Sequence, residues 1–165
     1  MLDEKPYETA VSQMGSDVKI IVMKIIVVGP DYSKYNAASY QFEFMNTLKE
    51  YSDEYYHYDL PKEIHIDNLL SLANFVPEII FYNHGWFIDN PAEKRIRYSK
   101  LKGDIFIKNI KHILFLNKEY TRLDEKLKEI NKYKFNLIFT HLHDFEKINN
   151  TKTKAKFLPL ACSYQ

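Results

Sequence analysis

Short apolar runs alternate with longer amphipathic segments from Met23 onward, and this alternation most constrains the fold of the chain. Most of the runs are apolar at consecutive positions, which is typical of strands that helices cover on both faces. Such strands belong to parallel sheets, because helical crossovers connect strands that point the same way. The predicted strands are Lys24–Gly29, Tyr55–Leu60, Glu78–Asn83, His112–Asn117, Phe135–Thr140 and Lys156–Leu160. The sequence therefore predicts an α/β fold with a Rossmann-like, doubly wound, mainly parallel sheet of about six strands.

Helix signals fill the segments between these strands. The predicted helices are one that starts at Asn36 or Ser39, a short one capped by Asp67, one from Asn90 to Gly103, and one over Thr121–Lys132. Each starts at a residue type that favours helix N-termini, and Thr121 and Asp124 stand at capping-box spacing. The charges from Arg122 to Lys134 are interpreted as the solvated face of the last helix. The segment Asp104–Ile110 fits a helix or a strand equally well.

Length and charge limit the classes of protein that fit. The chain has 165 residues, and we expect a flexible extension over residues 1–22 and a single domain over residues 23–165. Lys and Arg number 23 against 22 Asp and Glu, so no long-range field favours nucleic acid or an acidic membrane surface. The longest apolar stretch, Val18–Gly29, is too short for a membrane span. Cys162 is the only cysteine, so no intramolecular disulfide is expected, and a cytoplasmic location is favoured.

Polar and aromatic residues gather where the predicted strands end. In doubly wound sheets the ligand binds outside the carboxyl ends of the strands, so these residues form the candidate site. They are Gly29, Pro30, Asp31 and Tyr32 after the first strand, Asn83, His84, Gly85 and Trp86 after the third, Asn117, Lys118, Glu119 and Tyr120 after the fourth, and Thr140, His141, His143 and Asp144 after the fifth. The gathering predicts a cleft at this edge of the sheet.

Each group also has a structural interpretation. Gly29 suits a tight turn as well as a ligand-facing loop, and one glycine does not make the dinucleotide fingerprint, which needs three. His84 fits a general base or an ordinary loop residue, and Trp86 fits a sugar platform or a cover over the end of the sheet. His141 and His143 are metal-ligand types, but no fourth ligand is evident, so we expect no metal. The other histidines, interpreted as structural or surface residues, are His57, His65 and His112.

Several stretches together resemble one enzyme family. They are KIIVVG with the Tyr-rich loop after it, EIIFYNHGW, HILFLNKEYTRLDEKLKEINKYKFNLIFTHLHD and the closing KFLPLACSYQ. In order and spacing they resemble the amino-terminal half of GT-B fold glycosyltransferases, in particular the CgeB-type spore-maturation proteins, over roughly Lys24–Gln165. The resemblance implies the acceptor-side half of an enzyme that transfers a sugar from a nucleotide-sugar to a hydroxyl acceptor without a metal or other cofactor. The donor-binding domain of the family is expected to be absent from this chain.

The implied reaction needs a base near the acceptor hydroxyl and stabilisation of the departing diphosphate. We expect His84 or His141 as the base, with Asp31 or Asp144 as a rival or an orienting partner, and we expect the other strand-end residues to bind substrate. A second hypothesis is a non-catalytic, truncated domain that binds a glycan, a partner protein or a second copy of itself. A third is a flavodoxin-like or regulatory single domain, which is less favoured because Asp31 is the only acidic residue directly after the first strand.

Overall fold

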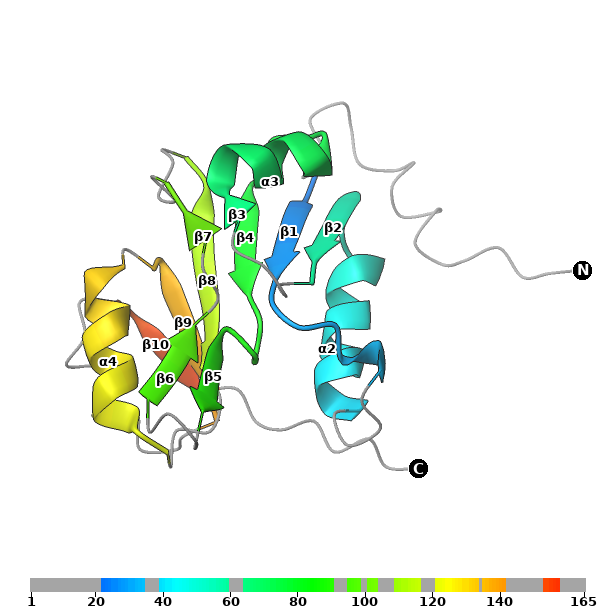
Figure 1. Ribbon diagram of the computed structural model, residues 1–165. Helices are drawn as coiled ribbons and strands as arrows, with labels where there is room; N and C mark the ends of the chain where they lie inside the picture. Colours follow the sequence, from blue (N-terminus) through cyan, green and yellow to red (C-terminus); the bar gives the residue numbers. More distant parts are fainter. Residues whose placement is uncertain are drawn as a thin grey trace, which may run out of the picture.

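A single parallel sheet forms the centre of the molecule (Figure 1). The computed structural model describes residues 22–34, 39–59, 64–90, 95–98, 101–103, 109–116, 121–133, 135–141 and 153–157. The strands of the sheet are β1 (Lys24–Val28), β2 (Glu54–Tyr58), β4 (Ile79–Tyr82), β8 (Lys111–Leu116), β9 (Leu137–Thr140) and β10 (Ala155–Phe157). Every pairing between them is parallel. The predicted α/β fold and its six-stranded, Rossmann-like sheet are confirmed.

The strand order is β10-β9-β8-β4-β1-β2. From β1 the chain moves outward to β2, and it then returns to the other side of β1 to form β4. Ile25 of β1 is accordingly paired with Tyr55 on one side and with Ile79 on the other. This order is the flavodoxin-like variant of the doubly wound sheet, in which the winding direction reverses between the first and third strands. Here the reversal lies between β1 and β4.

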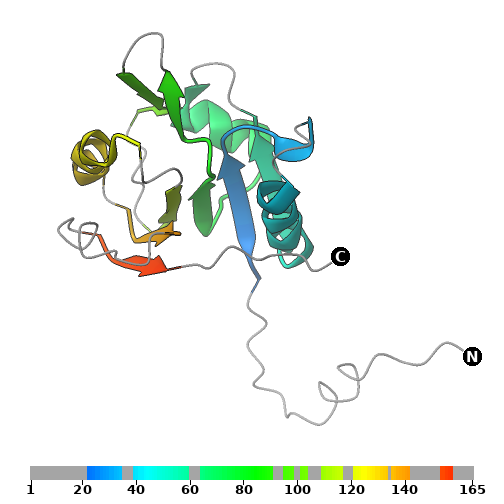
Figure 2. The ribbon, with the colours of Figure 1, turned by 90° about the horizontal axis from the view of Figure 1, so that it is seen from below.

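Helices cover both faces of the sheet, as the consecutive apolar positions require (Figure 2). Helix α2 (Ser39–Glu50) covers one face, where its Met45 packs with Ile25 and Val27 of β1. Helices α3 (Ile66–Ala73) and α4 (Leu123–Lys132) lie on the other face, where the core holds the alternate residues of β1. The strands therefore separate two apolar layers, and both exclude water.

The predicted helix from Asn90 to Gly103 is wrong. This part of the chain forms an antiparallel hairpin of β5 (Phe87–Asn90) and β6 (Arg95–Tyr98), a two-stranded sheet that is separate from the main sheet. A second small sheet pairs β3 (Ile64–His65) with β7 (Leu101–Lys102). Asn-Pro is a turn signal as well as a helix start, and Arg95–Tyr98 alternates polar and apolar residues with the period of a strand.

The starts of two helices also differ from prediction. Helix α3 is capped by His65, whose Nδ1 accepts a hydrogen bond from the backbone N–H of Asp67 at 3.4 Å, so Asp67 itself lies in the first turn. Helix α4 begins after Arg122, which has a left-handed φ of 48° and no capping side-chain hydrogen bond. The N-cap is therefore Arg122 and not the predicted Thr121. Residues 1–21 and 104–108, on which other predictions fall, lie outside the described residues.

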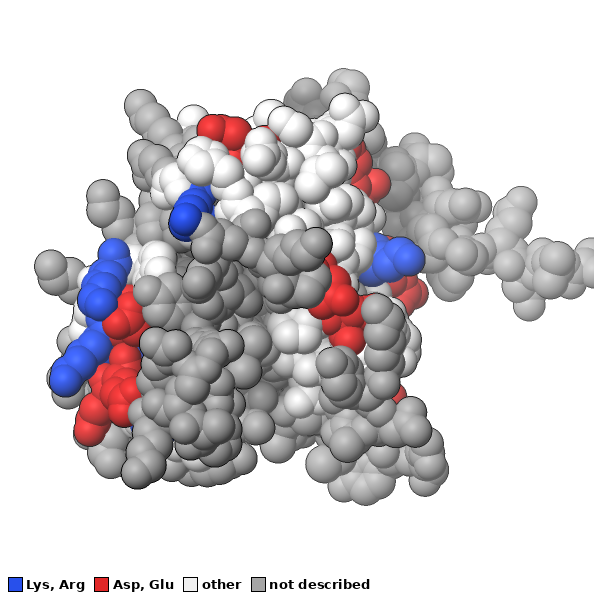
Figure 3. All heavy atoms as spheres, in the orientation of Figure 1, with Lys and Arg blue, Asp and Glu red and all other residues white. Residues whose placement is uncertain are grey.

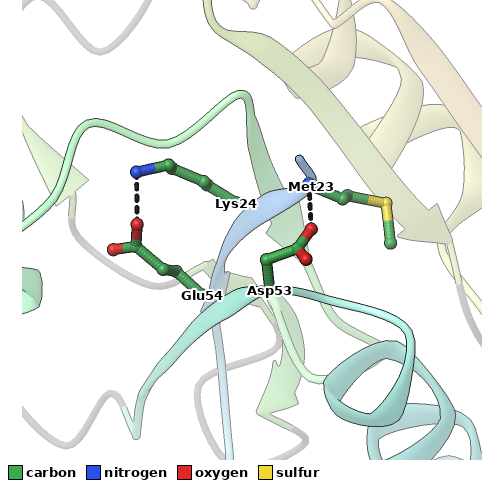
Figure 4. Close-up of polar contacts among 4 residues, drawn as sticks. All are labelled: Met23, Lys24, Asp53 and Glu54. Carbon is green, nitrogen blue, oxygen red and sulfur yellow. Dashed lines mark hydrogen bonds and ion pairs between the residues drawn. The ribbon is translucent and has the colours of Figure 1, made fainter. Parts of the chain in front are cut away.

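Polar contacts join β1 to β2 at the amino edge of the sheet (Figure 4). The backbone N–H of Met23 donates to Oδ2 of Asp53 at 2.5 Å, and Lys24 forms an ion pair with Glu54. On the face drawn in Figure 3, the described acidic and basic side chains are interspersed. Within the described part of the chain, no helix combines the length and apolar character that a membrane span needs.

Candidate functional site

The parallel sheet brings the candidate residues to one edge. Gly29–Tyr32 follow β1, Asn83–Trp86 follow β4, and His141 follows β9, so all three groups lie at the carboxyl ends of strands. Tyr32 begins a short 3₁₀ turn, η1 (Tyr32–Lys34). The other predicted site residues, Asn117, Lys118, Glu119, Tyr120, His143 and Asp144, lie outside the described residues.

Two imidazoles meet at this edge. The rings of His84 and His141 are nearly parallel, with an interplanar angle of 25° and centroids 6.2 Å apart. Phe115, from the end of β8, contacts both, with its ring centroid 3.7 Å from that of His84 and 4.9 Å from that of His141. The ring of Phe44 on α2 meets His84 edge-on at 5.9 Å. His84 is 4% exposed, whereas His141 is half-buried.

Burial gives the two histidines different chemistry. Burial, and secondly the proximity of His141, lowers the pKa of His84 to about 3, so its imidazole is neutral at neutral pH. A general base works best when its pKa lies near the working pH, and a group with a pKa of about 3 is far from that. A neutral imidazole still offers one donor and one acceptor. His141 is the more accessible of the two residues, although its Nε2 atom is buried.

The loop after β1 is hydrogen-bonded to Asp59, the residue that follows β2. The backbone N–H of Asp31 donates to Oδ1 of Asp59 at 3.1 Å, and Oδ1 of Asp31 accepts from the N–H of Ser33 at 2.9 Å. Burial, and secondly the charge of Asp31, raises the pKa of Tyr55 to about 12. The Tyr32 ring meets that of His84 edge-on, with centroids 6.1 Å apart. Asp31 is thus in the loop whose Tyr32 contacts His84.

Three residues that lie near the candidate site are not among the site residues predicted from the sequence. They are Phe44, Phe115 and Asp59. Phe44 lies in α2 and Phe115 in β8, and their contacts with His84 depend on how far each element extends toward the edge. Asp59 was placed inside a predicted strand, whereas β2 ends one residue earlier. The alternation of polar and apolar residues in that segment gave no clear end point. His57 bonds the carbonyl oxygen of Gly29 through Nε2 at 2.9 Å, in keeping with a structural role.

Trp86 lies inside the core. It is 1% exposed, and its ring meets that of Tyr82 edge-on with centroids 4.5 Å apart. Its face therefore covers apolar side chains and not an open cleft. Among the described residues there is also no group of three or more His, Cys, Asp or Glu side chains that could hold a metal ion.

The fold and this edge define an α/β domain with a doubly wound sheet and an imidazole pair at its carboxyl edge. Comparisons with protein-family models, curated proteins and solved structures found no match to this chain.

Proposed function

We propose that this chain is a glycosyltransferase-type domain that binds the acceptor of a sugar transfer from a nucleotide-sugar. The observation that carries the proposal is the stacking of His84 and His141, from the ends of β4 and β9, with centroids 6.2 Å apart. The carboxyl edge is where doubly wound sheets bind ligands, and it is here that ionisable and aromatic side chains converge. The order and spacing of the motifs that resemble GT-B enzymes add support from the sequence.

In this proposal His141 takes the proton of the acceptor hydroxyl as that oxygen attacks the anomeric carbon of the donor sugar. The bond from that carbon to the diphosphate breaks, and the nucleoside diphosphate leaves with the electron pair. His84 stays neutral and lies beside the ring of His141. Asp31 is the alternative base, because its loop contacts His84 through Tyr32.

Transfer also needs groups that stabilise the departing diphosphate, such as a helix N-terminus or cationic side chains. In GT-B enzymes the donor domain supplies them, so the proposal includes a donor-binding domain that completes the cleft. The proposed partners are a nucleotide-sugar and a glycan or other hydroxyl acceptor, with no metal ion and no further cofactor.

The test compares the chain alone with the chain joined to the reading frame that follows its gene. Both are assayed for hydrolysis of, and transfer from, UDP-glucose, UDP-N-acetylglucosamine, GDP-mannose and dTDP-rhamnose. His141→Ala is expected to lower kcat by about 10²-fold or more, the usual contribution of a general base. The matched control is His65→Asn, because His65 is an exposed histidine at the start of α3 and asparagine keeps a capping side chain there. Equal activity of His141→Ala and the parent protein removes His141 from the mechanism, and inactivity of both parent chains on every donor argues against the enzyme.

A second candidate function is a non-catalytic domain that binds a glycan or a partner protein. The depressed pKa of His84 favours it, because a buried neutral imidazole serves packing and hydrogen bonding better than proton transfer. This alternative predicts that glycans or a second copy bind with equal affinity to His141→Ala and to the parent chain. Calorimetry with a glycan panel and sedimentation velocity measure the two kinds of binding. A monomer that binds no glycan contradicts it.

A further inference from the structure

One side chain bonds the loop after β1 to the loop after β4. Asn83 is fully buried, and its Nδ2 donates to the carbonyl oxygen of Pro30 at 2.9 Å. Its Oδ1 accepts from the backbone N–H of Gly85 at 3.0 Å. Its own backbone N–H donates to the carbonyl oxygen of Val28 at 3.1 Å, and its carbonyl oxygen accepts from the N–H of Trp86 at 3.0 Å. Both ends of the amide are therefore used within the protein.

Two glycines pack so closely against Asn83 and the loop after β1 that neither position has room for a Cβ atom. A Cβ at Gly29, which has a φ of +140°, would lie 1.9 Å from Oδ1 of Asn83. A Cβ at Gly85 would lie 2.4 Å from the Pro30 ring and 2.8 Å from the Tyr32 hydroxyl. Any other residue at either position would force the loops apart. The place where the winding direction reverses, between β1 and β4, is thus filled by the protein's own side chains.

These contacts fix the two loops at the reversal point of the sheet. In doubly wound sheets the ligand usually binds at the reversal point, but here Asn83, Pro30 and Gly85 occupy it. The hydrogen bonds of Asn83 also hold the loop that carries Tyr32, whose ring contacts that of His84. The other polar groups of the described edge lie on both sides of this point, with Asp31 and Asp59 after β1 and β2 and with His84 and His141 toward β9.

We propose that Asn83 is a positioning residue that locks the two loops together and holds Tyr32 against His84. The sequence suggested that Asn83 binds substrate directly, and its burial and engaged amide give it this different role. The proposal goes beyond the proposed function, because it holds for a catalytic and for a non-catalytic edge alike.

NMR of the full chain tests the lock. Asn83→Asp keeps the shape of the side chain but removes the donor to Pro30, and Asn83→Ala removes both bonds. In both variants we expect the nuclear Overhauser contacts between the Tyr32 and His84 rings to disappear. We also expect the pKa of His84 to rise from about 3 toward the ordinary value near 6.5, because water reaches the ring when the loops part. Asn68→Asp, at an exposed position of α3, is the control and should change neither.

A contact in the core shows whether a variant loses only the contacts between the loops or loses packing throughout the protein. The contacts between Tyr82 and His112, on the far side of the sheet from α2, should persist in the Asn83 variants. Loss of those contacts to the same degree, or an unchanged His84 pKa in a folded variant, overturns the proposal. Should neither variant fold, amide exchange in the parent chain decides, because the Gly85 N–H bonded to Asn83 should exchange on the order of 10²-fold more slowly than in an open loop. Unprotected exchange there also overturns it.

Discussion

The hydroxyl of Tyr82 and Nδ1 of His112 lie 2.9 Å apart in a fully buried contact between β4 and β8. Burial raises the pKa of Tyr82 far above its usual range, so the hydroxyl keeps its proton. Burial lowers the pKa of His112 to about 4, so the imidazole is neutral at neutral pH. Oδ1 of Asn136 accepts from the backbone N–H of His112 at 2.7 Å and fixes that backbone as well. The contact is therefore a neutral hydrogen bond inside an apolar layer.

Replacing one partner should be costly, because the other stays buried. Tyr82→Phe is expected to lower the free energy of unfolding by roughly 1–3 kcal/mol, the usual penalty for leaving a buried polar atom without its bond. Urea unfolding followed by circular dichroism measures the change. The control is Tyr51→Phe, because Tyr51 is 70% exposed and should lose almost nothing. Equal effects of the two substitutions would contradict the role of the Tyr82 bond.

Stability should fall as the solution becomes acidic. The folded pKa values of His84 (about 3) and His112 (about 4) lie below the unfolded value near 6.5, so the unfolded chain binds more protons below pH 6.5. The stability that the two neutral histidines contribute is fully present above about pH 6.5 and is lost progressively toward pH 4 and pH 3. Each histidine adds a slope of up to ~1.4 kcal/mol per pH unit.

Unfolding in urea at a series of pH values from 7 to 4 measures this slope. His84→Phe removes one of the two titrating groups and places an aromatic ring beside Phe44 and Phe115, so its slope should be shallower. The exposed His65 serves again as the control, through His65→Asn. A slope that is the same in His84→Phe and in the parent chain would show that His84 titrates normally.

Lys126 lies on the buried side of α4, where solvent-facing charge was predicted. It is 0% exposed, and its Nζ donates to Oγ1 of Thr121 at 3.3 Å. Its amine should therefore react with an acetylating reagent at least about tenfold more slowly than those of Lys128 and Lys132 on the same helix. Peptide mass spectrometry after brief labelling of the native chain compares the three. Similar rates at all three lysines would place the Lys126 amine in solvent.

Substitution of the same lysine gives a separate expectation. Lys126→Met keeps much of the side-chain volume and removes a buried charge, so stability should change little or rise. Lys126→Ala leaves a cavity in the layer that holds Ile130 and should cost roughly 2–5 kcal/mol. Thermal and urea unfolding of the two variants measure the difference. A loss of stability in Lys126→Met as large as in Lys126→Ala would mean that the charge itself stabilises the fold.

A smaller effect on stability is expected at the amino edge of the sheet. Asp53→Ala removes the acceptor of the Met23 N–H and should lower the free energy of unfolding by roughly 0.5–1.5 kcal/mol. Asp53→Asn keeps an oxygen in the same place and should retain most of that stability. The comparison is made by urea unfolding at neutral pH. Equal losses in the two variants would indicate that the carboxylate charge, and not the hydrogen bond, matters at this position.

The sequence alone was sufficient for the sheet, because a strand that two layers cover must be apolar at consecutive positions. Lys24–Gly29 and Glu78–Asn83 carry that pattern, and it identified β1 and β4 to within a residue at each end. Parallel strands end at one edge, so placing His84 and His141 at the same edge followed from local pattern and topology. Their stacking is consistent with that expectation.

Only the tertiary structure decided the strand order, the hairpin in place of a helix, and the surroundings of each side chain. Burial of Trp86 depends on the core around it, which includes residues of β1, β4 and β8. The same is true of the amide of Asn83, whose bond to Pro30 joins loops that follow different strands. The apolar pattern within a segment predicts whether that segment becomes a strand, because the pattern reflects how the segment is buried. The depressed pKa of His84 and the lock at Asn83 arise from contacts between segments, which no single stretch of sequence encodes.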